Sequence, residues 1–241
     1  MQKNNVDSIV LAGGFGKRLK KHLPDLPKAL APINNTPFID LLIDQIKAFK
    51  KISKVILALG YKAKMIQNHC QKTNYGVPLE YSIEKTPLGT GGAFKKALHL
   101  CQTEHVLVLN GDSFLNFNFS SLFQAHIKQK ADITLVYTSV DDVSRYGQII
   151  VDPLSQKICS FKEKEKNKKS QGFISCGFYL VKKNLFKDLT LEKKESFSLE
   201  KEAFPLFLEK KRFFGFFCKE PFIDIGTKES FLESQTVLSH L

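Results

Sequence analysis

The chain has 241 residues, 43% of them hydrophobic, and a formal net charge of +12 at pH 7. No apolar run approaches the ~20 residues needed to span a membrane, and the five scattered cysteines lack the CxxC spacing of a zinc site. The lysines are spread out without a nucleic-acid-binding motif, so neither nucleic acid nor a membrane is expected as a partner. We expect a cytoplasmic protein with reduced cysteines and a preference for anionic substrates.

The first predicted element is a buried strand at Ile9–Leu11, which runs directly into the glycine-rich loop 12–16. A loop so poor in side chains lets the backbone approach a ligand and turn its N–H groups toward an anion. Arg18 and Lys28 add permanent positive charge beside this loop. The stretch predicts a polyphosphate site, although its spacing fits neither a Walker loop nor a dinucleotide fingerprint. An ordinary strand-to-helix turn with two basic neighbours is the alternative interpretation.

The next segments alternate between helix and strand. Apolar residues at helical spacing predict a helix at Pro37–Lys51, and a short apolar run predicts a second buried strand at Lys54–Leu59. A second helix is predicted at Lys62–Gln71, and Leu79–Ile83 alternates like a strand. This order favours a parallel sheet with right-handed crossovers.

A second glycine-rich loop at 84–93, EKTPLGTGGA, precedes a helix predicted at Phe94–Cys101. Its place between a strand and a helix indicates another point where the backbone approaches a ligand. The most apolar run, His105–Leu109, predicts a central strand, and an Asn-Gly-Asp turn ending in Asp112 follows it. A carboxylate just beyond the carboxyl end of a central strand lies where open α/β sheets bind ligands. The alternative is that Asp112 only caps a turn.

The second half of the chain continues the pattern with fewer clear signals. Two strands and two helices are predicted there: Asp132–Ser139, Gly172–Val181, Ser196–Phe207 and Glu229–Leu241. The aromatic run FFGFF at 213–217 is either core or part of a subunit contact, so a homo-oligomer is left open. A second carboxylate, Asp224, follows an apolar run and stands close to a glycine.

Several motifs occur together in a fixed order. LAGGFGKRL and PKALAP, followed by LGTGG, NGD, RYG, FKEK and FIDIGT, resemble the signature of the sugar-1-phosphate nucleotidyltransferase family over nearly the whole chain. Within this family the segments look most like the heptose 1-phosphate guanylyltransferases, with mannose and other hexose 1-phosphate enzymes next. The resemblance implies a Rossmann-like α/β fold with a mixed, mostly parallel sheet flanked by helices. It also implies one domain over 1–241, with a nucleotide-binding half to about residue 112, a sugar-binding half after it and no C-terminal β-helix.

The resemblance further implies that a nucleoside triphosphate and a sugar 1-phosphate react to give a nucleotide sugar and pyrophosphate. The nucleotide is expected against Leu11, Ala12, Gly13, Gly14, Gly16, Arg18, Lys28, Glu84, Gly89 and Thr90. The sugar is expected against Asn110, Gly147, Glu163, Lys164 and Ser175. Catalytic roles are implied for Arg18, Lys28 and Asp112, and Mg²⁺ as cofactor on Asp112 and Asp224.

Three residues depart from the family pattern, and a fourth residue, Glu84, predicts which base is bound. Lys17 stands where the family usually has Thr, and Ser175-Cys176 stand where close relatives often have Asn-Gly. Glu84 is an acceptor-only carboxylate that matches the adjacent N1–H and 2-amino donors of guanine, which favours GTP. The alternative is that Glu84 only pairs with Lys85 or Lys95. A catalytically dead regulatory relative is disfavoured, because the expected charged residues are all present.

Overall fold

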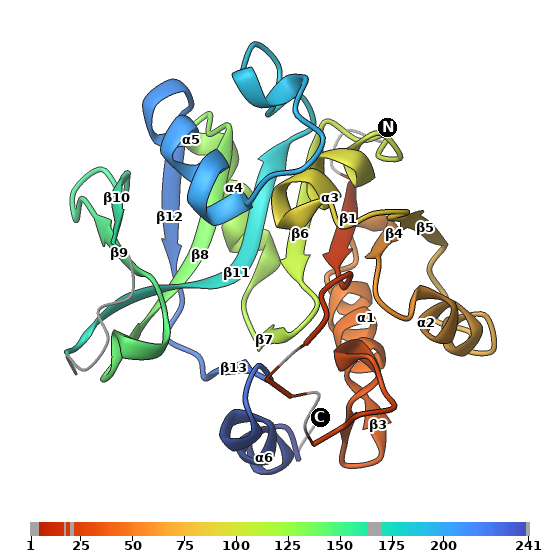
Figure 1. Ribbon diagram of the computed structural model, residues 1–241. Helices are drawn as coiled ribbons and strands as arrows, with labels where there is room; N and C mark the ends of the chain where they lie inside the picture. The colour runs from red at the N-terminus through yellow and green to blue at the C-terminus, as the bar shows by residue number, and fades with distance from the viewer. Residues whose placement is uncertain (1–4, 17, 20–21, 163–169, 240–241) are drawn as a thin grey trace.

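The computed structural model describes residues 5–16, 18–19, 22–162 and 170–239, and within them nine strands form one mixed sheet (Figure 1). The strands of this sheet are β1 (Val6–Leu11), β4 (Ile52–Leu59), β5 (Leu79–Ile83), β6 (His105–Asn110), β8 (Ile133–Val140), β9 (Gln148–Val151), β10 (Ile158–Lys162), β11 (Gly172–Lys182) and β12 (Phe213–Phe217). Two small sheets accompany it: β7 (Ser113–Leu115) with β13 (Phe222–Asp224), and β2 (Pro32–Ile33) with β3 (Thr36–Pro37).

Helices cover both faces of the large sheet. The α-helices are α1 (Phe38–Ala48), α2 (Ala63–Cys70), α3 (Gly89–Leu98), α4 (Phe119–Lys128), α5 (Phe204–Lys210) and α6 (Lys228–Val237). Short helical turns are η1 (Lys28–Leu30), η2 (Val143–Arg145), η3 (Thr190–Glu192) and the π-helical turn η4 (Leu199–Ala203). The predicted mixed α/β fold with flanking helices is confirmed.

The strand order is β10-β9-β11-β6-β1-β4-β5, with β8 next to β11 and β12 next to β8. Strand β1 is parallel to both β4 and β6, and β4 is parallel to β5. Strand β11 is antiparallel to β6, β8 and β9. Because β1, β4 and β6 are parallel and adjacent, their carboxyl ends meet at one edge of the sheet, where the glycine loop and the Asn-Gly-Asp turn begin.

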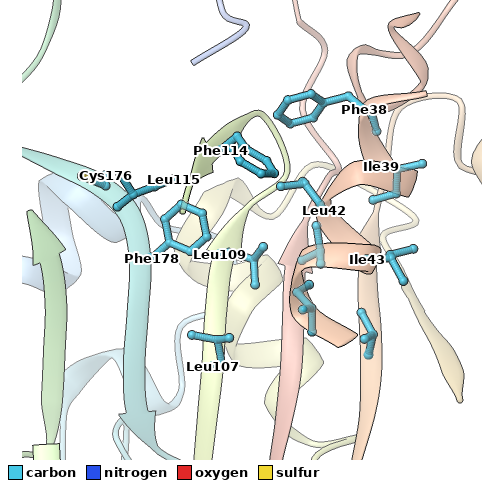
Figure 2. Close-up of a cluster of buried hydrophobic side chains, with 14 of the residues drawn as sticks. Phe38, Ile39, Leu42, Ile43, Leu107, Leu109, Phe114, Leu115, Cys176 and Phe178 are labelled. Atoms are coloured by element: carbon cyan, nitrogen blue, oxygen red, sulfur yellow. The ribbon is translucent and has the colours of Figure 1, made fainter. Parts of the chain in front are cut away.

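The central strands are buried on both faces, which explains their nearly continuous apolar sequences. In β6, Leu107 and Leu109 point into a cluster shared with α1, while Val106 and Val108 point into a cluster shared with α3 and α5. Figure 2 shows the first cluster, where side chains of α1 pack against β6, β7 and β11. Two hydrophobic cores, one on each face of the sheet, therefore hold the central strands, and with them their carboxyl ends, in place.

The predicted strands agree with the structure more closely than the predicted helices. The strand expected at Leu79–Ile83 coincides with β5. The helix expected at Phe94–Cys101 instead begins at Gly89, so that Gly-Thr-Gly-Gly is its first turn rather than a loop. The helix expected at Ser196–Phe207 is wrong at its start, because the helical backbone begins at Leu199 as a π-helical turn.

Helix α4, which the sequence analysis did not anticipate, carries a recognisable start signal. The Asn118 side chain accepts a hydrogen bond from the Ser121 backbone N–H at 2.9 Å, which caps the helix. Phe119, Leu122 and Phe123 then face the core. The cap and the apolar spacing together would have predicted this helix.

The structure also shows where the cysteines and the FFGFF run lie. All five cysteines are free, and only Cys159 is exposed. The run FFGFF forms β12, in which Phe213 and Phe214 are buried and Phe217 is 37% exposed, so most of the run belongs to the core. In the described part of the chain, no helix is long and apolar enough to cross a membrane.

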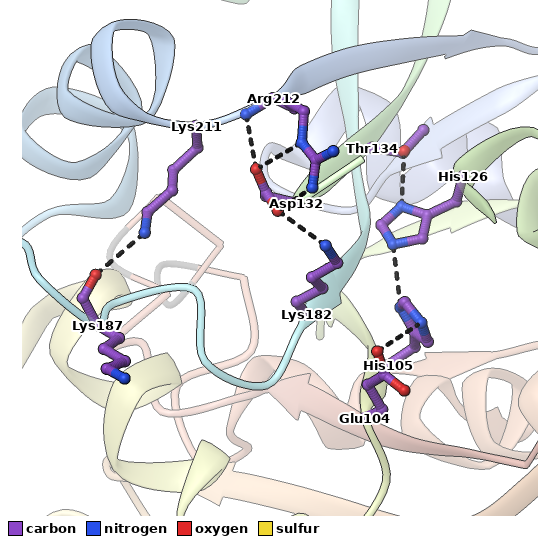
Figure 3. A network of polar contacts seen from close by, with 9 residues as sticks. All are labelled: Glu104, His105, His126, Asp132, Thr134, Lys182, Lys187, Lys211 and Arg212. Carbon is purple, nitrogen blue, oxygen red and sulfur yellow. Dashed lines mark hydrogen bonds and ion pairs between the residues drawn. The ribbon is translucent and has the colours of Figure 1, made fainter. Parts of the chain in front are cut away.

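A polar network links β6, α4 and β8 at the amino end of β6, away from the glycine loop (Figure 3). His105 Nδ1 lies 3.1 Å from His126 Nε2, and His126 Nδ1 lies 2.8 Å from Thr134 Oγ1. Nearby, Asp132 accepts hydrogen bonds from Lys182 and Arg212. Burial, together with the neighbouring His105, lowers the pKa of His126 to about 3. His126 is therefore neutral in the folded protein near pH 7.

The buried neutral His126 predicts a loss of stability in mild acid. Below its unfolded pKa of roughly 6.5 the unfolded chain binds a proton that the folded chain excludes, so the free energy of unfolding falls as the pH falls. At pH 5 this one group should cost about 2 kcal/mol relative to pH 8. Urea unfolding at both pH values should show this loss in the parent protein and a smaller loss in His126→Gln. A His99→Gln control should retain the full loss, and equal pH dependence in all three proteins would contradict the prediction.

Candidate active site

The glycine loop and the Asn-Gly-Asp turn are joined where β1 and β6 end. The backbone N–H of Gly111 donates to Leu11 O at 2.9 Å, and Ala12 N–H donates to Ala58 O at 2.9 Å. A Cβ at position 111 would lie 2.9 Å from the Ala12 Cβ, so only glycine allows this contact. The turn that carries Asp112 is thereby held against the glycine loop.

A cavity of about 500 Å³ opens at this edge of the sheet. All ten residues predicted to bind the nucleotide line it, together with Asn110 and Asp112. Several other lining residues were not predicted from the sequence: Phe15, Ala29, Pro87, Ala93, Gly111, Tyr179, Leu199, Glu200 and Gly226. The structure thus brings the predicted nucleotide residues together, while the role of each one stays a prediction.

The two predicted metal carboxylates are brought together by the small sheet of β7 and β13. In this antiparallel pair Asp224 lies opposite Ser113, and Ile225 N–H donates to Asp112 O at 2.9 Å. The Lys28 ammonium faces both carboxylates, 2.6 Å from Asp112 Oδ2 and 3.9 Å from Asp224 Oδ1. Two acids far apart in the sequence therefore share one cation.

This carboxylate pair fits Mg²⁺. Mg²⁺ prefers hard oxygen ligands and is usually bound through one or two carboxylates, with waters and substrate phosphates completing its shell. Within the described residues, no cluster of three or more His, Cys, Asp or Glu side chains forms a dedicated protein cage. Asp112 and Asp224 already face a cation, the Lys28 ammonium, so their oxygens lie where a positive charge is stabilised.

Glu84 lies at the cavity with one oxygen held by the backbone. Its Oε2 accepts a hydrogen bond from Leu88 N–H at 2.9 Å, and a Cβ built on Gly13 would lie 2.8 Å from its Oε1. The suggested pairing with Lys95 is wrong, because the Lys95 ammonium donates to backbone carbonyls elsewhere. No ion pair of Glu84 with Lys85 is found among the described residues either. The carboxylate is therefore fixed in orientation and directed toward the glycine loop.

The predicted sugar residues are only partly brought together. Asn110 lines the cavity, whereas Gly147 is exposed and not among the lining residues. Ser175 does not line the cavity, but its Oγ lies 3.3 Å from the hydroxyl of Tyr179, which does. Burial, and then the charge of Glu200, raise the pKa of Tyr179, so its hydroxyl stays protonated. Glu163, Lys164 and Lys17 lie outside the described residues.

The glycine after Cys176 has a steric reason to be there. Gly177 has φ +75°, and a Cβ at this position would come within 2.5 Å of Asn110 Nδ2. Glycine at 177 therefore leaves room for the Asn110 side chain at the cavity. This close approach of Gly177 to Asn110 is a contact between β11 and the last residue of β6.

A cavity at the carboxyl edge of a Rossmann-like sheet, with a glycine loop, basic side chains and paired carboxylates, defines a nucleotide-binding protein suited to phosphoryl transfer. The chain belongs to the nucleotidyl transferase family, whose model matches residues 7–240.

Relatives within this family include two proteins named D-glycero-alpha-D-manno-heptose 1-phosphate guanylyltransferase. That of Aneurinibacillus thermoaerophilus is 39% identical over 82% of this chain and 85% of its own length. That of Campylobacter jejuni is 40% identical over 80% of this chain and 83% of its own length. Solved structures of HddC from Yersinia pseudotuberculosis, one complexed with GMP-PN, are 31% identical and superpose with a TM-score of 0.85 over 97% of this chain and 99% of theirs.

Proposed function

We propose that this chain is a guanylyltransferase that joins GTP to a heptose 1-phosphate, giving a GDP-heptose and pyrophosphate. The relatives at 39% and 40% identity carry this activity in their names, and HddC was solved with a guanine nucleotide analogue. The observation that carries the base assignment is the placement of Glu84 at the cavity, oriented by Leu88. A fixed carboxylate matches the donor edge of guanine and is repelled by the acceptor N1 of adenine.

The chemistry follows from positioning and charge. The sugar phosphate is already ionised, so its oxygen can attack the α-phosphorus of GTP in line without a protein nucleophile. The loop of Gly13, Gly14 and Gly16 would cradle the triphosphate with its N–H groups, and Arg18 would stabilise the leaving pyrophosphate. Lys28 would stabilise the charge that develops at the α-phosphate.

Mg²⁺ is part of the proposal, with Asp112 and Asp224 as the residues that would hold it. When bound, the ion would supply charge neutralisation and alignment of the phosphates. The enzyme is also proposed to act in the cytoplasm, as expected from its sequence.

The proposed function is tested with a matrix of nucleoside triphosphates against sugar 1-phosphates, scored by pyrophosphate release. GTP with a heptose 1-phosphate should give the highest kcat/KM. A mannose or other hexose 1-phosphate as the best acceptor would overturn the sugar assignment. Pyrophosphate release that never depends on a sugar phosphate would overturn the transferase itself.

Glu84 predicts the size of the base preference. The parent enzyme should favour GTP over ATP, UTP, CTP and dTTP by roughly 10²-fold or more in kcat/KM, the scale of losing a charged hydrogen-bond pair. Glu84→Gln should erode this preference, because an amide presents a donor where guanine also has one. Glu209→Gln, on the exposed end of α5, should leave the preference unchanged. Unchanged selectivity in Glu84→Gln would remove this carboxylate from base recognition.

A further inference from the structure

A segment from the second half of the chain is bound along the loop and first turn of α3. We call residues 191–199 the strap; Figure 1 shows the chain between β11 and α5 passing beside α3. Phe197 N–H donates to Leu88 O at 3.0 Å, and Gly91 N–H donates to Phe197 O at 3.0 Å. Leu199 N–H donates to Thr90 Oγ1 at 3.0 Å. The hydroxyl of Thr90, predicted to face the nucleotide, is thus engaged by the strap.

The glycines of this turn are required by the strap. A Cβ at Gly89 would lie 2.6 Å from Phe197 O, and one at Gly91 would lie 2.3 Å from the Phe197 ring. A Cβ at Gly92 would lie 2.1 Å from Glu195 O. From the sequence, these glycines were expected to make room for a ligand. Gly89 does line the cavity, but Gly91 and Gly92 make room for another part of the chain.

One ammonium group holds the beginning of the strap. Lys95 Nζ donates to three carbonyl oxygens, those of Leu191 at 3.1 Å, Glu192 at 2.9 Å and Lys194 at 2.5 Å. An ammonium has three donors, so this arrangement satisfies all of them with charge-assisted bonds. The same Nζ lies 5.8 Å from the centre of the Phe197 ring. Lys95 therefore fastens the strap to α3 at several points.

The strap supports two parts of the cavity lining. It ends at Leu199, which lines the cavity together with the next residue, Glu200, and the Leu199 N–H donates to Oγ1 of another lining residue, Thr90. It also holds Leu88 through the carbonyl of that residue, and the N–H of Leu88 orients Glu84. A connected series of bonds thus leads from the Lys95 ammonium through the strap and Leu88 to the carboxylate proposed to recognise the base.

We infer that Lys95 is a positioning residue for nucleotide selectivity, acting through the strap and Leu88 on Glu84, and this inference rests on the proposed function. Lys95 itself is not among the cavity-lining residues, so its effect must be indirect. Without its ammonium, the strap should loosen and the base-binding wall should lose its fixed geometry. Binding of the nucleotide should suffer more than the chemical step.

The test compares Lys95→Met with Lys211→Met, because the Lys211 ammonium also donates to a backbone carbonyl, that of Lys187 at 3.0 Å (Figure 3). Neither Lys211 nor Lys187 lines the cavity. We expect Lys95→Met to raise KM for GTP by about tenfold and lower the preference for GTP over ATP by a similar factor, with kcat changed less than about threefold. Lys211→Met should match the parent enzyme. Lys95→Arg, which retains charge and several donors, should recover most of the selectivity.

The outcomes separate this inference from the proposed function. A parent enzyme that releases no pyrophosphate with any substrate pair would contradict the proposed function. In that case, calorimetric titration of GTP alone into the parent protein and Lys95→Met would still measure the effect of Lys95 on nucleotide binding. Parent-like KM and selectivity in Lys95→Met would overturn the inference. The inference would also be overturned if Lys95→Met lowered kcat and the melting temperature together while KM stayed unchanged, since that pattern indicates a merely structural role. If Lys95→Met does not fold, Lys95→Gln is measured against the same criteria.

Discussion

Replacing Asp112 or Asp224 by asparagine should lower kcat by about 10²-fold or more, the usual scale for losing one group that stabilises transition-state charge. Each variant removes one of the two negative charges that face the Lys28 ammonium and would hold Mg²⁺. The fold should survive, because the Asp112 and Asp224 side chains are 38% and 22% exposed. An asparagine at 224 can still accept the Gly226 N–H that Asp224 Oδ1 accepts now.

Turnover alone would not assign the loss to a metal site, so binding is measured as well. Calorimetric titration of Mn²⁺ into the protein with a non-hydrolysable GTP analogue should show weaker binding in both variants. Asp44→Asn is the matched control, since Asp44 pairs with Lys47 on the surface of α1. Near-normal turnover together with parent-like Mn²⁺ affinity in both variants would remove the carboxylate pair from the mechanism.

Lys28→Ala should lower kcat by about 10²-fold and raise KM for the nucleotide much less, because a group that acts on developing charge is lost mainly from the transition state. The Lys28 side chain is only 15% exposed and its ammonium lies between Asp112 and Asp224, so it is already fixed before substrate arrives.

Steady-state kinetics at saturating sugar phosphate would separate the two parameters for Lys28→Ala. Lys62→Ala serves as control, because Lys62 is near the loop and donates to Pro24 O without lining the cavity. A change in KM alone would make Lys28 a binding group and refute its assigned role in the chemical step.

The sequence by itself determined the elements whose signals are local. Strand β5 was predicted to the residue, since the alternation of apolar and polar residues in Leu-Glu-Tyr-Ser-Ile is a signal carried within the strand itself. Asp112 was predicted at a ligand site because it follows the carboxyl end of a central strand, and β1 and β6 do pair in parallel, which brings the glycine loop beside it. The ten nucleotide residues that the family resemblance implied do line one cavity.

Only the tertiary structure decided the parts of the site that depend on distant segments meeting. Asp224 comes beside Asp112 through the pairing of β13 with β7, and no local periodicity specifies that pairing. Tyr179 on β11 and Glu200 in η4 both line the cavity, although in the sequence they resemble core and helix-surface residues. Gly91 and Gly92 are a second example of what the sequence alone does not determine. A glycine indicates that a Cβ would clash at its position. The atoms that this Cβ would meet, here those of Phe197 and Glu195, belong to a segment about one hundred residues away along the chain.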